Sequence, residues 1–582
     1  MKAVPKSVRR GARRKGLLAM VLLASAWPAA VHSLDGDIPI AVAAGSQLPD
    51  AVVSDGRGGG IVVWNDSRSG NADIYAQHVQ AAGDVDPAWT VNGLAICSAQ
   101  GEQWAAAAVT DGTGGAIVVW HDFRGGNVAG AGDIYAQHVL ANGSVDPRWP
   151  PDGRAICLAP GDQLYPTITT DGSGGAIIAW RDARNGTTDV CAQHVLASGV
   201  IDPAWPAGGR FLCTALGNQD VDAIVTDEQG GALVVWVDGR SQVDADIYAQ
   251  HVLSQGTVDP AWPDDGLAIR SGPSEQDNAS AVSDGAGGAI VVWTDAHRNP
   301  AGDFFGTFDV FAQHVLTSGS IDSSWPLSGL GVCTAQGDQL LGGITPDGLG
   351  GAIVAWQDFR NGSPSIYAQH LQTSGTSDPA WPVDGLPLCA GVGGERDAPR
   401  IASDGRGGAT IVWADRRFTD YDIFTAQVRR RGFSEDVLFG KGRPLCVASG
   451  SQIDPEIAAD AAGRAVVVWR DYRNGDADIH GRCINAGPSS KVSVASSSYG
   501  LSVGQRGGGT KPEVDFTLPN AQAISLDVFD PAGRHVCSLM SSQQLEAGVH
   551  VVGIDTELDQ GVYLVRLIGA GGSMTRKLSI VR

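Results

Sequence analysis

The chain has 582 residues, which is long enough for two or more domains and a sizeable buried core. It contains 79 glycines and 43% hydrophobic residues, with little sequence of amphipathic helical period, and this composition indicates many short strands joined by tight turns. The formal net charge of -22 predicts an acidic surface that repels phosphate backbones and anionic lipid, so nucleic acid is excluded as an expected partner.

Residues 1–33 have the pattern of a secretory signal peptide. Seven basic residues and no acid precede an apolar stretch from Leu17 to Val31, and Val31-His32-Ser33 offers a cleavage site. The alternative, a membrane anchor, is disfavoured because the apolar stretch is short. No later segment is apolar enough to span a bilayer, so we expect a secreted or cell-surface protein without a transmembrane segment after the signal peptide.

An internal repeat dominates the next 450 or so residues. Each copy has an apolar run that ends in Trp, and spacings of 56 to 63 residues separate the copies. A Gln, or Arg396 in the seventh copy, stands seventeen residues before each Trp, and an Asp stands eight residues after that Gln position.

Each repeat predicts four strands in chain order. The first leads to a "DGxGG" hairpin whose glycines suit positive backbone angles, and the second is the apolar run that ends in Trp. The third is the "DIYAQHV" segment, and the fourth is a short "LAIC" type segment. Four strands in about 57 residues are typical of a propeller blade, so residues 34–485 predict an all-β, eight-bladed β-propeller.

The two ends of the repeat region predict how the ring closes. A lone fourth-strand segment, "DIPIAV" at 37–42, precedes the first repeat, and the eighth repeat stops after its third strand at 478–484. The N-terminal segment can therefore complete the last blade and leave no open sheet edge there.

The run "PDAVVSDGRGGGIVVWNDSRSGNADIYAQHV" at 49–79 resembles the TolB-type propeller repeat. In that repeat a proline-led strand, an Asp-Gly hairpin and a "DIY" strand follow one another. The resemblance covers about residues 36–485 and implies the fold; it says little about function.

A "WxDxR" motif follows the second strand of the repeat, and recurrence once per blade indicates packing between blades. The Asp can accept backbone donors in the turn while the Arg pairs with it. The alternative is a calcium ion held by "DxRxGxxD", which the central Arg disfavours, so no cofactor is expected and Ca²⁺ is the alternative. The structural residues are Trp64, Asp66, Arg68, Trp120, Asp122, Arg124, Trp180, Asp182, Arg184, Trp236, Asp238, Arg240, Trp293, Asp295, Trp356, Asp358, Arg360, Trp413, Asp415, Arg417, Trp469, Asp471 and Arg473.

Histidines and cysteines also recur once per blade, which spreads them around the ring. Copies in different blades cannot converge on one metal ion or come within disulfide distance, so no metal site is expected and most of the nine cysteines should be buried free thiols. A Cys191–Cys213 bridge within one blade is the alternative. The histidines are His78, His138, His194, His251, His314 and His370, and the cysteines of the fourth strand are Cys97, Cys157, Cys213, Cys333, Cys389 and Cys446.

A ligand site is best sought where one repeat differs from the rest. The loop after Trp293 is the longest of its kind, and it replaces the expected Arg with His297 and adds Asp303, Phe304, Phe305 and Phe308. Exposed aromatics beside charge often mark a contact surface, although a loop folded on itself is the alternative. Trp104 and Tyr165, in loops that lead into the second and third repeats, are further candidates.

A polar, Ser- and Gly-rich linker at 486–509 precedes a final module at 510–582. Alternating strands around a "DPAGR" turn at 530–534 predict a small β-sandwich. With "LEAGVH" at 545–550, "GVYLVRL" at 561–567 and "TRKLSIVR" at 575–582, the module resembles the immunoglobulin-like domain of the flagellar hook-capping and type IX sorting group. That resemblance implies type IX-like export machinery as a partner, or surface attachment.

Taken alone, the sequence favours a monomeric, non-catalytic propeller that binds an extracellular protein or glycan. No catalytic residue is assigned, because the carboxylates of the propeller recur as copies within the repeat. The alternative is a propeller-based polysaccharide hydrolase or lyase, which requires carboxylates that converge in the central channel.

Overall fold

The computed structural model describes residues 36–126, 132–296, 307–390, 394–397, 399–417, 419–432, 442–485, 500–505 and 512–580, the last range with short gaps at 519–521, 531–533, 546–547, 555–557, 559–560 and 570–571. The predicted signal peptide lies outside the described residues. Every regular element in the described part is a β-strand, so the predicted all-β class is confirmed. No helix in that part has the length and apolar character needed to cross a membrane.

Eight antiparallel sheets follow one another along the chain, and each is one blade. The first strands of blades 1 to 8 are β2 (Gln47–Ser54), β6 (Gln103–Thr110), β10 (Gln163–Thr170), β14 (Gln219–Thr226), β18 (Glu275–Ser283), β23 (Gln339–Pro346), β28 (Arg400–Ser403) and β32 (Gln452–Ala459). The second strands are β3 (Gly60–Asp66), β7 (Ala116–Asp122), β11 (Ala176–Asp182), β15 (Ala232–Asp238), β19 (Ala289–Ala296), β24 (Ala352–Asp358), β29 (Ala409–Asp415) and β33 (Arg464–Asp471).

The outer half of each blade is formed by a long third strand and a short fourth strand. The third strands are β4 (Asp73–Val79), β8 (Asp133–Val139), β12 (Asp189–Val195), β16 (Asp246–Val252), β20 (Phe308–Leu316), β25 (Ser365–Gln372), β30 (Asp422–Val428) and β34 (Asp478–Asn485). The fourth strands are β5 (Leu94–Cys97), β9 (Arg154–Cys157), β13 (Arg210–Cys213), β17 (Leu267–Arg270), β22 (Leu330–Cys333), β27 (Leu386–Cys389), β31 (Arg443–Cys446) and, in blade 8, β1 (Ile38–Ala41). Two short strands, β21 (Ser320–Ile321) and β26 (Thr376–Ser377), extend blades 5 and 6.

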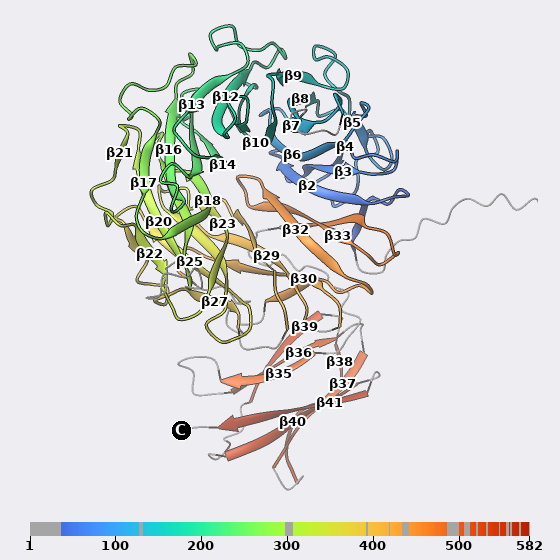
Figure 1. Cartoon of the computed structure of the whole chain (residues 1–582). Helices are drawn as coiled ribbons and strands as arrows, with labels where there is room; N and C mark the ends of the chain where they lie inside the picture. The colour runs from blue at the N-terminus through green and yellow to red at the C-terminus, as the bar shows by residue number, and fades with distance from the viewer. Residues whose placement is uncertain are drawn as a thin grey trace, which may run out of the picture. The chain divides into compact units, whose positions relative to one another are not determined.

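The eight blades close into a ring. The first strand of each blade contacts the first strands of both neighbouring blades, and the last such contact joins β32 to β2. These eight strands therefore surround a common axis (Figure 1). The end of the ring at which the first strands begin is called the mouth below.

The N-terminal strand closes the ring as the sequence predicts. Strand β1 pairs antiparallel with β34, with Ile38 opposite Gly481 and Ala41 opposite Ile479. Asp37, just before β1, is buried, accepts a hydrogen bond from Arg473 at 2.9 Å and forms an ion pair with Arg482. A buried charge network thus fixes the first strand of the chain to the last blade.

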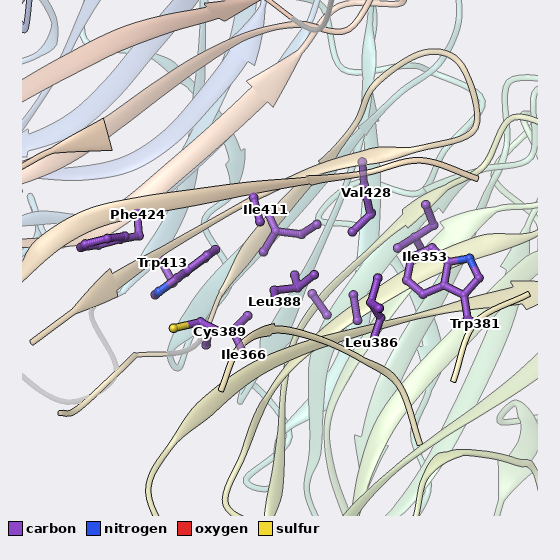
Figure 2. Packing of buried hydrophobic residues seen from close by; sticks show 14 residues of the cluster. Ile353, Ile366, Trp381, Leu386, Leu388, Cys389, Ile411, Trp413, Phe424 and Val428 are labelled. Carbon is purple, nitrogen blue, oxygen red and sulfur yellow. The ribbon is translucent and has the colours of Figure 1, made fainter. Parts of the chain in front are cut away.

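Neighbouring blades pack through large apolar side chains. Figure 2 shows one such boundary, where Ile353, Leu388 and Trp381 of blade 6 meet Ile411 and Trp413 of blade 7. The eight second-strand tryptophans have no exposed surface at all. Burial of side chains this large is the main apolar contribution to the stability of the ring.

At six of the eight boundaries the "WxDxR" motif joins a blade to the one before it. The indole N–H of Trp120 donates to Asp122 at 2.8 Å, and Nε of Arg124 donates to the same carboxylate at 2.9 Å. The same Arg reaches Sγ of Cys97 in the preceding blade at 3.5 Å. Equivalent Arg–Cys contacts of 3.0–3.4 Å form at five further boundaries. Since its oxygens already accept these donors, the Asp is poorly suited to bind calcium.

The repeated histidines each lie between two carboxylates of their own blade. In blade 3, His194 Nδ1 is 2.8 Å from Asp202 and Nε2 is 3.0 Å from Asp171. Two acceptors require a hydrogen on both ring nitrogens, so this geometry favours the charged imidazolium. Six blades contain this arrangement, which is called the histidine clamp below. It ties the first hairpin, the third strand and the following turn together.

The nine cysteines are all described and all free, so the alternative of a Cys191–Cys213 bridge is not realised. Seven are buried. Burial raises the pKa of the Cys97 thiol to about 12, which keeps it protonated and unreactive near neutral pH.

Two antiparallel sheets form the C-terminal part. One contains β35 (Gly500–Gln505), β36 (Pro512–Leu518) and β39 (Gly548–Gly553), and the other contains β38 (His535–Leu545), β37 (Gln522–Phe529), β40 (Gly561–Gly569) and β41 (Gly572–Ile580). Both sheets contribute to one hydrophobic cluster that includes Phe516 and Leu526. Strand β35 lies inside the segment assigned to the linker, because "GLSVGQ" pairs with β36. The immunoglobulin-like relationship of this module stays a prediction.

Replacing Asp37 by Ala should destabilise the propeller. Arg473 and Arg482 would lose their shared carboxylate, and removal of one partner from a buried charge network costs about 3 kcal/mol. Urea unfolding of the variant measures the change, with Asp84→Ala, an exposed turn residue, as the control. An Asp37→Ala variant as stable as the Asp84→Ala control would contradict the role given to this network.

The histidine clamps of His194, His251 and His370 predict a stability maximum at mildly acidic pH. Burial acts to lower the pKa of His194, but Asp171 and Asp202 outweigh it and raise that pKa, so this contribution is complete below about pH 6.5 and is lost as pH rises through the folded value. Burial acts to raise the pKa of Asp171, but His194 and the hairpin amides hold it below its ordinary value. That contribution is complete above about pH 4 and is lost as pH falls through the folded pKa.

Urea midpoints measured across pH should therefore be highest between about pH 4 and 6.5 and should fall on both sides. The variant His194→Gln should lose part of the decline above that range. A midpoint that keeps rising from pH 5 to pH 9 would show that the histidines do not carry charge in the folded protein.

Candidate functional site

The residues first proposed as ligand contacts fall into two groups. His297, Asp303, Phe304 and Phe305 lie outside the described residues. Phe308 begins strand β20, is half-buried and pairs with Ala296, so it is part of the sheet of blade 5. Residues 297–306 of this long loop lie outside the described residues, so the contact surface proposed for them stays a prediction.

Trp104 and Tyr165 have a different environment. They are 37% and 53% exposed, and they are the only aromatic residues among the exposed large hydrophobic side chains of the described part. Trp104 is the second residue of β6 and Tyr165 the third residue of β10, so both lie at the mouth in neighbouring blades.

The first strands carry bulges at the mouth. Pairing between first and second strands shifts register between Pro49 and Ala51 in blade 1, and at the corresponding place in blades 2 to 6 and 8. Four non-glycine residues at these bulges have positive φ angles of 51° to 54°: Ala105, Tyr165, Asn278 and Asp454. Strained backbone of this kind is often found at functional sites, where the surrounding structure holds it in place.

The residue between Trp and Asp of "WxDxR" varies from blade to blade and lies beside these bulges. Side chains from this position and from the bulges are together called the mouth belt below, and six of the eight varying residues make polar contacts there. The varying residues are Asn65, His121, Arg181, Val237, Thr294, Gln357, Ala414 and Arg470. Two examples are Thr294, whose hydroxyl accepts from the Leu341 amide at 3.5 Å, and Gln357, which donates to the Arg396 carbonyl.

One part of the mouth belt is aromatic. His121 lies opposite Trp104 in the β6–β7 pair, which places the two side chains on one face of the sheet. The His121 ring packs edge-on against Tyr165 at 5.6 Å and accepts a hydrogen bond from its amide at 3.4 Å. Arg181 covers the Tyr165 ring at 4.6 Å and pairs with Asp220 at 2.9 Å. Burial lowers the pKa of His121 to about 4, so its imidazole is neutral at neutral pH.

The other part contains a pair of carboxylates where blades 8 and 1 meet. Asp50 lies at the bulge of β2 and accepts hydrogen bonds from the Asn65 amide group and the Ala106 backbone. Glu456 lies on the neighbouring strand β32 and accepts from Arg400 of blade 7 at 2.9 Å. Both carboxylates are half-buried.

Burial is the main cause of an unusual ionisation at Asp50. It raises the pKa of that carboxyl to about 7, and the negative charge of Glu456 acts in the same direction. Burial also raises the pKa of Glu456, against the opposing effect of Arg400. Two neighbouring carboxyl groups with raised pKa values, of which Asp50 holds a proton near neutral pH, form an arrangement suited to general acid–base chemistry.

Sequence reasoning missed this pair because it took the acids of the propeller as repeated. Asp50 stands three residues after Gln47, and only blade 4, with Asp222, has an acid at the same place. Glu456 has no acidic counterpart at its place in any other blade. Both residues could have been found from the sequence. Each stands at a position of the first, innermost strand where the otherwise strict repeat varies.

The histidine clamps and the thiols do not create a metal centre. In each clamp the two carboxylates lie on opposite sides of the imidazole, so they share no common centre. Within the described ranges, no three His, Cys, Asp or Glu side chains gather in a way that could hold a metal ion.

Comparisons with known proteins place the fold only. No model of a known protein family matches the chain, and no characterised protein matches it in sequence. The β-propeller domain of the Trilobed protease from Pyrococcus furiosus is 9% identical with a TM-score of 0.35, and the match covers 63% of this chain and 91% of that one. An ulvan lyase of polysaccharide lyase family PL25 is 10% identical with a TM-score of 0.40, over 69% of this chain and 99% of that one.

The α-L-arabinofuranosidase Arb93A from Fusarium graminearum is 10% identical with a TM-score of 0.32, over 66% of this chain and 93% of that one. The prediction of a protein without catalysis is corrected here, since the similar solved structures are enzymes and do not support it: they include a polysaccharide lyase, an arabinofuranosidase and a xylan β-1,4-xylosidase. At this level of similarity they assign no activity to this chain. The physical reason for the error is the assumption that all acids of the propeller are repeated, which Glu456 contradicts.

The unusual ionisation of Asp50 predicts a substitution that stabilises the fold. Its pKa is raised from 3.8 to about 7, so ionisation costs stability as pH rises through that range. Asp50→Asn keeps the acceptor for the Ala106 amide and removes the cost, and it should add about 1–3 kcal/mol at pH 8 and little at pH 4. Urea unfolding at both pH values measures this. Equal destabilisation at both values would show that Asp50 is a structural carboxylate.

Proposed function

We propose that the propeller is a carbohydrate-active enzyme that hydrolyses glycosidic bonds of an extracellular polysaccharide at its mouth. The observation that carries the proposal is the pair of Asp50 and Glu456, two half-buried carboxylates on neighbouring first strands with raised pKa values. Glycoside hydrolysis needs two such carboxyl groups, one that gives a proton and one that activates the attacking group.

Asp50 is suited to the role of general acid. With a pKa of about 7 it keeps its proton in a large share of molecules near neutral pH, and it can give that proton to the glycosidic oxygen as the bond to the leaving sugar breaks. Its contacts with Asn65 and the Ala106 amide hold the carboxyl group in one orientation.

Glu456 is suited to the role of base. The guanidinium of Arg400 at 2.9 Å favours its ionised form against the effect of burial. The carboxylate can take a proton from the water molecule that attacks the anomeric carbon, so that one water is consumed for each bond cleaved.

The ends of the chain support an extracellular location for this activity. A basic and then apolar segment at 1–33 has the pattern of an export signal, and the C-terminal β-sandwich resembles modules that direct export or attach proteins to the cell surface. A polysaccharide is a substrate that such an enzyme meets outside the cell.

The proposal is tested by incubating the full chain with a panel of neutral and acidic polysaccharides and measuring new reducing ends. At least one polysaccharide should be cleaved. Asp50→Asn and Glu456→Gln should each lower kcat by about a hundredfold or more, the usual contribution of a general acid or base. The acidic limb of the pH profile should move when Arg400 is replaced by Gln, because the Glu456 carboxylate loses its cation.

Asp222→Asn is the matched control. Asp222 occupies the same place in blade 4, accepts from the Ala279 amide at 2.6 Å and has a pKa raised to about 7. Its acidic neighbours are Asp220 and Asp277, and the place that Glu456 has on the preceding blade is taken by Thr167. This variant should keep full activity. Cleavage that survives both the Asp50 and Glu456 substitutions, or no cleavage of any polysaccharide, would refute the proposal, and products with an unsaturated end would assign a lyase reaction in place of hydrolysis.

A further inference from the structure

The two exposed aromatic residues of the described propeller occur together. Trp104 and Tyr165 lie in adjacent blades at the mouth, and His121 links them as the cross-strand neighbour of one and the ring partner of the other. The other tryptophans of the repeat are fully or almost fully buried. Exposure of two large apolar rings to water at one place is unfavourable, so packing alone does not explain it.

The Tyr165 ring is held rigidly in this exposed position. Its φ angle of 52° is strained for a bulky residue, and His121 and Arg181 contact its edge and its face. A preorganised aromatic ring loses little conformational freedom when a ligand stacks on it.

We propose that Trp104 and Tyr165 form a subsite that stacks a sugar ring of an uncharged polysaccharide, with Arg181 and Asp220 as hydrogen-bonding groups at its edge. The apolar face of a pyranose ring suits an aromatic platform, and its hydroxyl groups suit a paired guanidinium and carboxylate. The choice of a saccharide rests on the proposed function, which this inference deepens by naming the substrate class.

The charges around the subsite favour an uncharged sugar. Arg181 is already neutralised by Asp220 at 2.9 Å. Asp222 follows two residues later on the same strand, and the negative charge of Asp277 acts on it. Burial keeps His121 neutral at neutral pH. A uronate or sulfate group would therefore meet net negative charge, and the chain as a whole carries a formal charge of -22.

The subsite and the carboxylate pair share strand β6. Asp50 accepts a hydrogen bond from the backbone of Ala106, which is two residues after Trp104 on that strand. The proposal therefore places the stacked sugar and the bond to be cleaved on one saccharide chain.

Isothermal titration calorimetry with the full chain tests the inference. The probes are cellohexaose, xylohexaose and mannohexaose as neutral oligosaccharides, and a galacturonate hexamer as the anionic one. At least one neutral hexamer should bind more tightly than the galacturonate. Trp104→Ala and Tyr165→Ala should each weaken that binding by about tenfold or more, the effect of losing one stacked ring, while Trp104→Phe should retain most of it.

Leu349→Ala is the control for exposed apolar surface, because Leu349 is 58% exposed on the first hairpin of blade 6, at the other end of the strands from the mouth. It should bind as the unmodified chain does. Unfolding curves of all variants identify any that fail to fold, and the Trp104→Phe variant keeps the test decisive if Trp104→Ala is one of them.

The outcomes separate this inference from the proposed function. Binding that depends on Trp104 and Tyr165, without cleavage of any polysaccharide, would support the subsite and refute the hydrolase. Cleavage that is indifferent to both aromatic substitutions, preference for the galacturonate, or no binding of any hexamer would refute the subsite.

Discussion

The structure depends on one repeated contact, in which a buried Asp accepts both the indole N–H of its own blade and an Arg that reaches the neighbouring blade. In blade 2 these are Trp120, Asp122 and Arg124, and the Arg meets Cys97 of blade 1. A carboxylate with no exposed surface is stable only when it is fully paired. Eight blades can close into a ring only if every boundary has the same shape, so this contact recurs and explains most of the repeated residues.

The boundary between blades 4 and 5 shows that the contact requires a guanidinium beside the buried carboxylate, and not an Arg at one fixed position. Blade 5 has no Arg at its usual place after Asp295. Blade 4 has Arg270 where other blades have the fourth-strand Cys, and its Nε approaches Asp295 at 3.4 Å. At the next-but-one boundary, Arg396 replaces the usual Gln and donates to Asp415 at 3.0 Å and to Cys389, in addition to Arg417 at its usual place. In each case a guanidinium approaches the buried carboxylate from another direction.

Much of the fold could be predicted because repetition records packing. The eight blades, the four strands in each and the closure by β1 all follow from spacings that the ring requires. The carboxylate pair could not be predicted in the same way, because Asp50 and Glu456 meet only through bulges and ring closure, which join residues some 400 positions apart. Trp104 and Tyr165 could be named from their loops, whereas no pattern in the sequence marked His121, which links them. The residues of the proposed chemistry are therefore found at positions that the repeat does not constrain.

The central claim is that the repeated Trp, Asp and Arg residues stabilise the ring, whereas residues at the mouth bind and cleave the substrate. A substitution scan of residues 37–485 with two readouts, resistance of the folded protein to protease and binding of a neutral hexasaccharide, tests it most directly. The account predicts that changes at the repeated Trp, Asp and Arg residues abolish protease resistance, whereas changes at Asp50, Trp104, Tyr165 and Glu456 leave it intact and lower only binding or cleavage. A scan in which these four residues are as necessary for protease resistance as the repeated ones would contradict the account.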